Sequence, residues 1–147
     1  MCSIKFKKLS ENALVPSYGT DFSAGADLYA LLDCDCVTVA PREQYLIHTG
    51  ISLQIPEGYA GFVLSRSGLA SKKGLAPANK VGVIDSDYRG EIMVPLFNHS
   101  SKPQVIENNE RIAQIVFMPY LKADFVESDN LENTMRADGG FGSTGNK

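Results

Sequence analysis

The sequence predicts an all-β domain, a jelly-roll-like distorted β-barrel, on three observations. Short segments rich in Val, Ile, Leu and Tyr recur along most of the 147 residues, separated by Gly, Pro, Asn or Asp. Seven prolines interrupt the chain too often for long helices. Only one short stretch has a helical pattern, and one short helix among many strands is typical of jelly rolls and related closed β architectures.

Four apolar runs are the clearest predicted strands. In one of them, Ile51, Leu53 and Ile55 alternate with polar residues, as expected for a strand with one buried face. The other three span Tyr59–Leu64, Glu91–Asn98 and 111–120. Pro95 lacks the N–H that a strand donates to its neighbour, so it predicts an edge or a bulge at that point.

A single helix is predicted over Ser67–Lys73. Ser67 is the expected N-cap, and Lys72 and Lys73 suit the negative end of a helix. Gly74 provides the stop. Arg66, Ser67 and the backbone at the start of this helix could bind an anion, although an ordinary N-cap beside a surface arginine explains the same residues.

Residues 82–92, GVIDSDYRGEI, are predicted to form a β-hairpin. Apolar residues flank a polar tip that contains Asp85 and Tyr88 and turns at Gly90. Such a hairpin would present carboxylates, a phenol and a guanidinium at the mouth of a sheet. A solvated turn explains these residue types equally well, because Asp and Gly are common in turns.

Composition predicts one domain over residues 1–130 and a flexible C-terminal arm over 131–147, where the sequence becomes polar and ends in GGFGSTG. No run approaches the roughly 20 apolar residues of a membrane span, and the N-terminus lacks a signal-peptide pattern, so a cytoplasmic location without membrane binding is expected. The net charge of −3 argues against non-specific nucleic-acid binding. Three cysteines and two separated histidines predict neither a disulfide framework nor a metal site made by side chains alone.

Several polar residues occur where a strand or a tail would not need them. Asp27 in AGADLYA and Gln114 in ERIAQIVF lie in apolar segments, where each needs hydrogen-bond partners or a wet site. In the tail, Ser143 and Thr144 among glycines could bind phosphate oxygens, and Phe141 could stack on a nucleobase. A disordered tail with an exposed phenylalanine is the alternative.

Taken in order, AGADLYA, SRSGLA, GVIDSDYRGEI, ERIAQIVF and RADGGFGSTG resemble the five motifs of the trimeric deoxyuridine triphosphatase (dUTPase) family over residues 24–145. The resemblance implies the β-clip variant of the jelly roll and a homotrimer whose three active sites each draw on all three chains. It also implies hydrolysis of dUTP to dUMP and pyrophosphate, with Mg²⁺ bound to the triphosphate. This reaction would supply dUMP for dTMP synthesis and keep uracil out of DNA.

The resemblance also implies a role for individual residues. Asp85 would activate the water that attacks the α-phosphorus, and Tyr88 would pack under the deoxyribose and exclude a 2′-hydroxyl. Asp27 would hold Mg²⁺ through water. The groups implied to read uracil are Asn79 and the backbone around Val83, Ile84 and Met93. The groups implied to bind phosphates are Arg66, Ser67, Gly68 and Gln114. In the arm, Phe141 would stack on uracil, and the implied phosphate contacts are Arg136, Gly142, Ser143 and Thr144.

Two other functions fit parts of the sequence. A dCTP deaminase shares the fold and needs a glutamate beside the base, for which Glu91 is the nearest candidate. The intact FGSTG arm favours the plain dUTPase. A non-enzymatic trimer that binds nucleotide and signals through a partner protein is the second alternative, and the presence of Asp85 argues against it.

Overall fold

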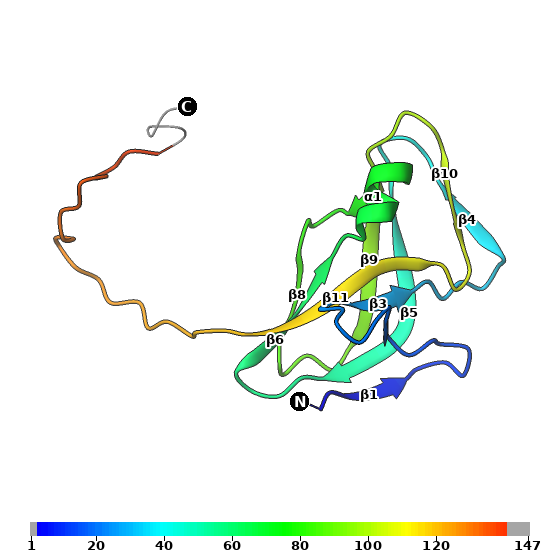
Figure 1. Cartoon of the computed structure of the whole chain (residues 1–147), viewed down its shortest axis with the longest axis horizontal. Helices are drawn as coiled ribbons and strands as arrows, with labels where there is room; N and C mark the ends of the chain where they lie inside the picture. The colour runs from blue at the N-terminus through cyan, green and yellow to red at the C-terminus, as the bar shows by residue number, and fades with distance from the viewer. Residues whose placement is uncertain (1–2, 141–147) are drawn as a thin grey trace.

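A computed structural model of the chain describes residues 3–140, in which eleven strands and one helix follow one another (Figure 1). Their bounds are β1 Lys5–Lys8, β2 Ser17–Tyr18, β3 Ala26–Tyr29, β4 Cys36–Val39, β5 Gln44–Gln54, β6 Tyr59–Leu64, α1 Ser67–Lys73, β7 Leu75–Pro77, β8 Gly82–Ile84, β9 Glu91–Asn98, β10 Gln104–Glu107 and β11 Arg111–Pro119. No helix among these residues is long and apolar enough to cross a membrane.

The strands form three antiparallel sheets. One has the order β1-β5-β9-β7, a second has the order β2-β3-β11-β6-β8, and β10 pairs with β4 in a small two-stranded sheet. Side chains from the two larger sheets share one buried apolar cluster, which includes Ile47, Val94, Leu28 and Ile115. The predicted all-β, jelly-roll-like fold is confirmed, although the described strands do not close into a single barrel.

The helix occupies the predicted residues, but its first cap differs from the prediction. Arg66, with an extended backbone (φ −84°, ψ 128°), is the N-cap, and no side chain caps the helix. Ser67 is therefore the first helical residue, because the carbonyl of Arg66 already accepts the N–H of Ala70 at 2.9 Å. Gly74 ends the helix in the left-handed conformation, as predicted.

The prediction that residues 82–92 form a β-hairpin is wrong, because β8 and β9 do not pair with each other. β8 pairs with β6 in the five-stranded sheet, whereas β9 pairs with β5 and β7 in the four-stranded sheet. The polar segment between them crosses from one sheet to the other. Each of the two apolar runs does form a strand. A pattern of two apolar runs around a turn does not say whether the runs pair with each other or with other strands.

Pro95 does not lie in an edge strand or at a bulge, because β9 lies between β5 and β7 and keeps its register with β5 at the Leu46–Pro95 pair. The β7 pairing ends one residue further on, at Leu96, and the Pro95 carbonyl accepts the N–H of Ala78 at 2.7 Å. The N–H and C=O of one strand residue point to the same side. The N–H that proline lacks therefore falls beyond the last β7 pair, where no strand needs it.

The C-terminal segment leaves the sheets after β11 and extends away from them (Figure 1). From residue 121 to 140 it forms no helix or strand, and Leu121, Phe125 and Leu131 are each at least 87% exposed. The chain leaves the domain somewhat before residue 130. The division into a domain and an arm over 131–147 stays a prediction, because residues 141–147 lie outside the described range.

Candidate functional site

Most of the predicted site residues within the described range lie in two separate hollows. The first, which we call the guanidinium pocket, has a volume of about 530 Å³ and lies where β3, β11 and the β6–α1 junction meet. Its lining includes Asp27, Arg66, Ser67, Gly68, Gln114 and Arg111. All of the predicted phosphate and magnesium residues outside the arm therefore lie together.

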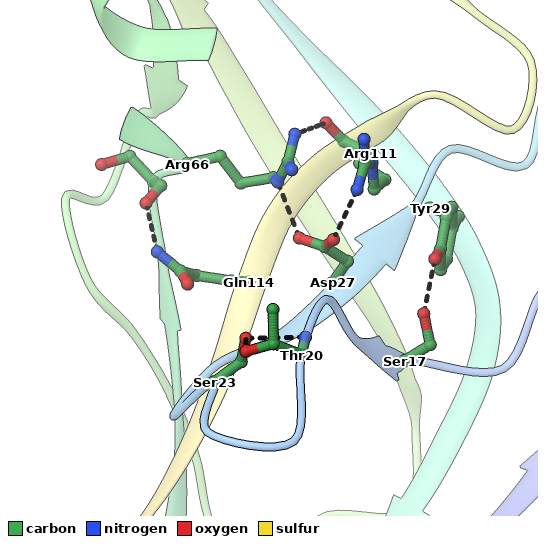
Figure 2. A network of polar contacts seen from close by, with 9 residues as sticks. Ser17, Thr20, Ser23, Asp27, Tyr29, Arg66, Arg111 and Gln114 are labelled. Atoms are coloured by element: carbon green, nitrogen blue, oxygen red, sulfur yellow. Dashed lines mark hydrogen bonds and ion pairs between the residues drawn. The ribbon is translucent and has the colours of Figure 1, made fainter. Parts of the chain in front are cut away.

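Asp27 joins two arginines at the centre of this pocket (Figure 2). Arg66 Nε donates to one carboxylate oxygen at 2.7 Å, and Arg111 Nη1 donates to the other at 3.3 Å. Asp27 is only 8% exposed, so this pairing satisfies a charge that would otherwise be costly to bury. Each guanidinium has five N–H donors, so both retain donors for an anionic ligand.

Arg111 is a site residue that the sequence reasoning missed. It begins β11 and pairs with Tyr29 of β3, the strand that carries Asp27. The signal was present in the ERIAQIVF motif, because an arginine at the start of an apolar strand can reach a carboxylate on the neighbouring strand. Only the tertiary pairing of β11 with β3 shows which carboxylate it reaches.

Gln114 lies on β11, where its backbone pairs with Asp27 of β3 on one side and Leu64 of β6 on the other. Its Nε2 donates to the carbonyl of Ser65 at 3.0 Å (Figure 2). The amide fits only because Gly25 has no side chain; a Cβ there would overlap Gln114 Oε1. The expectation that this amide needs partners is confirmed, and the bond fixes the segment that leads into Arg66.

The second hollow, which we call the β8–β9 cleft, has a volume of about 220 Å³ and opens between the two larger sheets. It is lined by Leu46, Val83, Ile84, Asp85, Tyr88, Glu91 and Met93. Five of these residues have a role implied by the dUTPase resemblance, and a sixth, Glu91, is the candidate of the deaminase alternative. They come from strands of different sheets and from the segment that joins them.

Backbone polar groups face this cleft as well. Pro95 directs its carbonyl away from β5, and residues two apart in a strand point the same way, so Met93 directs its N–H and C=O to the same side. β7 pairs only with residues from Leu96 onwards, which leaves this stretch of β9 without a strand partner on that side. β8 is an edge strand and also has a free side.

Asp85 is exposed at the end of β8 and lines both the cleft and a larger hollow of about 880 Å³. The segment after it is held by its own hydrogen bonds. Arg89 Nη1 donates to the carbonyls of Ser86 and Tyr88 at 2.7 and 2.8 Å, and Ser52 Oγ donates to the Arg89 carbonyl at 2.7 Å. These bonds give Arg89 a structural role in the turn.

The remaining predicted residues lie away from both hollows or outside the described range. Asn79 is exposed in the turn between β7 and β8, beside Gly82, and is not part of the lining of the β8–β9 cleft. Arg136 is exposed and donates to the carbonyl of Gly139 at 2.9 Å. Four predicted site residues of the arm lie outside the described range, namely Phe141, Gly142, Ser143 and Thr144.

Metal-binding capacity is limited in residues 3–140, where no group of three or more His, Cys, Asp or Glu side chains could hold an ion. The carboxylate of Asp27 accepts one hydrogen bond at each oxygen, and a carboxylate has about four acceptor positions. One acceptor position on each oxygen is therefore left for a metal-bound water. This donor set fits a magnesium ion that takes its direct ligands from a substrate and from water.

Comparison with known proteins gives a consistent result. The dUTPase family model matches residues 11–145. A deoxyuridine 5′-triphosphate nucleotidohydrolase of Hydrogenobaculum sp. (strain Y04AAS1) is 51% identical over 96% of both chains, and that of Nautilia profundicola is 47% identical over 97% of this chain and 98% of the relative. A solved mutant of the Staphylococcus bacteriophage 80alpha dUTPase with dUpNHpp covers 99% of both chains with a TM-score of 0.88 and 28% identity. The chain belongs to the dUTPase family.

Proposed function

We propose that the chain is a dUTP diphosphatase, which hydrolyses dUTP to dUMP and pyrophosphate. The observation that carries this proposal is the β8–β9 cleft, where Asp85, Tyr88 and the free backbone groups of Met93 come together from two sheets. A cleft with hydrogen-bonding edges, one aromatic ring and one carboxylate suits a nucleoside whose attached phosphate is attacked by water.

The cleft supplies base and sugar recognition. Free backbone N–H and C=O groups of β8 and β9 can pair with the uracil edge, as backbone groups do in β-strand addition. Val83 and Ile84 line the cleft, so β8 would lie against C5 of a bound uracil, where the methyl group of thymine would collide. Tyr88, which is 41% exposed, offers its ring to the sugar.

The chemical step belongs to Asp85. Its carboxylate is exposed at the cleft, accessible to water, and can accept the proton of a water molecule that attacks the α-phosphorus. The bond between that phosphorus and the bridging oxygen then breaks, and pyrophosphate leaves. Positioning and neutralisation of charge supply most of the remaining rate acceleration in phosphoryl transfer.

The guanidinium pocket binds the β- and γ-phosphates in this proposal. Arg66 and Arg111 hold their guanidinium groups on Asp27 and direct free donors into the pocket, while Ser67 and Gly68 offer the first amides of α1. Magnesium bound to the triphosphate would neutralise charge there, with Asp27 contacting it through water. A solved mutant of the dUTPase from phage phi11 of S. aureus coordinates a structural Mg(II) ion.

The separation of the two hollows supports a homotrimer with shared sites. The guanidinium pocket and the β8–β9 cleft have no lining residue in common. The exposed apolar side chains of residues 121–140 also have no partner within the described part of the chain. A cyclic trimer would bring the cleft of one subunit to the pocket of the next and let the arm of the third cover both, with Arg136 and the 141–144 segment on the substrate.

Pyrophosphate release from dUTP, dTTP, dCTP and UTP in the presence of Mg²⁺ tests this function. Release from dUTP at a rate at least about 100-fold above that of the other three is expected, because the cleft rejects the methyl group of dTTP and the 2′-hydroxyl of UTP. The base edge of dCTP has its donors and acceptors exchanged and leaves the backbone groups unpaired. Equal release from all four would contradict the proposed cleft. Formation of dUTP or dUMP from dCTP would instead indicate the deaminase.

A further inference from the structure

The position of Tyr88 depends on Gly90 and Glu91, which lie two and three residues further along the chain. Its hydroxyl donates to the main-chain carbonyl of Glu91 at 3.0 Å, and its N–H donates to the carbonyl of Asp85 at 3.2 Å. The ring therefore folds back over Gly90. A Cβ at Gly90 would overlap the Tyr88 hydroxyl and the ring carbon that bears it, so no other residue fits there while the ring keeps this position.

The side chain of Glu91 binds in the opposite direction, into β5. Its Oε1 accepts the N–H groups of Gly50 and Thr49 at 2.7 and 3.1 Å, and its Oε2 is 2.8 Å from His48 Nδ1. The side chain is only 19% exposed. Burial raises the pKa of Glu91, but the hydrogen bonds from His48 and Gly50 outweigh it, and the pKa lies below its ordinary value of 4.5.

The carboxylate replaces strand pairing where the ladder is interrupted. The register between β5 and β9 shifts between His48 and Ser52, which leaves the amides of Thr49 and Gly50 without a ladder partner. The Glu91 carboxylate accepts both of them. One residue therefore anchors the start of β9 to β5 with its side chain and holds the tyrosine hydroxyl with its carbonyl.

We propose that Glu91 is a positioning residue for Tyr88, and that together with Gly90 it sets how strictly the enzyme distinguishes deoxyribose from ribose. The proposal rests on the proposed function, in which the Tyr88 ring lies against the sugar. Glu91 does not touch substrate through its carboxylate, which is occupied by β5. This also removes it as the acid or base of a deaminase.

Replacement of Glu91 by alanine tests the proposal through a ratio rather than a rate. The ratio of kcat/KM for dUTP to that for UTP should fall about tenfold in Glu91→Ala, because the free energy of one hydrogen bond corresponds to a factor of about ten. The ratio for dUTP to dTTP should change less than about threefold, because β8 excludes the methyl group. Glu91→Gln should keep most of the sugar selectivity, because its amide oxygen still accepts the Gly50 and Thr49 N–H groups.

Glu110→Ala is the matched control. The Glu110 side chain is 21% exposed, accepts Lys73 Nζ at 2.6 Å and the N–H of Glu107 at 3.0 Å, and lies outside the cleft. Its loss should lower the melting temperature as Glu91→Ala does, without changing the sugar ratio. A folded Glu91→Ala variant whose sugar ratio stays within twofold of the wild type would overturn the proposal.

Two further variants keep the test decisive if Glu91→Ala does not fold. Gly90→Ala displaces the Tyr88 ring directly and should lower the same ratio about tenfold or more. Tyr88→Phe removes only the hydroxyl that donates to the Glu91 carbonyl, and it should lower the ratio as well. An unchanged ratio in Gly90→Ala would contradict the proposal. A wild-type protein with no preference for dUTP would instead refute the proposed function, and this inference with it.

Discussion

The guanidinium pocket and the β8–β9 cleft are built in different ways. The pocket lies within one continuous sheet, where neighbouring strands bring Asp27, Arg111 and Gln114 side by side through regular pairing. The cleft lies between two sheets, and its walls meet because the chain crosses from β8 to β9. The pocket is thus held by partly buried charge pairs, and the cleft by hydrogen bonds from single side chains at an interrupted ladder.

This contrast suggests that the two regions respond differently to substitution. Changes in the cleft should alter the chemical step or the choice of nucleotide. Changes in the pocket should alter binding of the phosphates and the stability of the fold, because its residues are partly buried and paired.

The largest expected effect is in the cleft. Asp85→Asn should lower kcat at least about 1,000-fold with little change in the affinity for dUTP, because the amide cannot accept the proton of the attacking water. Pyrophosphate release measures the first quantity and calorimetric titration with a non-hydrolysable analogue measures the second. Asp87→Asn, two residues away and also exposed, is the control and should keep most of the activity. Near-full hydrolysis by Asp85→Asn would refute its role.

Removal of residues 139–147 connects the two regions, because the arm is proposed to cover both. The truncated chain should lose about 100-fold in kcat/KM, because the substrate is no longer held in position, while it stays trimeric. Steady-state kinetics and light scattering after size-exclusion chromatography measure the two properties. Normal hydrolysis by the truncated chain would show that the arm has no part in the site.

In the pocket, Asp27→Asn should raise the inhibition constant of pyrophosphate about tenfold and lower the free energy of unfolding by about 1–3 kcal/mol, since both arginines lose a charged partner. Glu110→Gln is the control, because it weakens a comparable pair with Lys73 outside the pocket. It should lower stability and leave pyrophosphate inhibition unchanged. If Asp27→Asn left pyrophosphate inhibition unchanged, the two arginines would not depend on Asp27.

The smallest expected effect concerns pH. The pKa of Glu91 is lowered in the folded chain, so its carboxylate stabilises the fold above the ordinary value of 4.5 and loses this contribution as the pH falls through the folded pKa. The wild type should exceed Glu91→Gln in unfolding free energy by about 1 kcal/mol or less near neutral pH, with the difference shrinking below pH 4.5. Urea unfolding of both proteins at pH values from about 3 to about 7 measures this difference in unfolding free energy. A difference that grows in acid would contradict the assignment.

The sequence predicted local structure well and tertiary pairing poorly. The bounds of α1, β6 and β9 match the predictions because propensity, capping glycine and apolar pattern act within a few residues. The hairpin prediction was wrong because the two apolar runs around Asp85 have the same sequence pattern whether they pair with each other or belong to two different sheets. Pro95 was misplaced for a similar reason, since only the length of β7 decides whether its missing N–H matters.

Predictions for the site divide along the same line. Asp27, Arg66 and Gln114, to which the motifs gave phosphate and magnesium roles, lie in one pocket, but the motifs could not show that Arg111 completes the charge pairing. Glu91 was considered only as a deaminase residue, because its bonds to Thr49 and Gly50 depend on an interrupted ladder that no local pattern reveals.

Subunit complementation tests the central claim, that the cleft of one chain works with the pocket of another. Arg66→Ala and Asp85→Asn each spoil one half of the site, so each variant alone should be nearly inactive. Dissociated together and reassembled in equal amounts, they should recover about a quarter of the wild-type dUTPase activity, since random trimers pair intact halves at that frequency. Activity no higher than that of the separate variants, in trimers shown by mass spectrometry to be mixed, would contradict the claim.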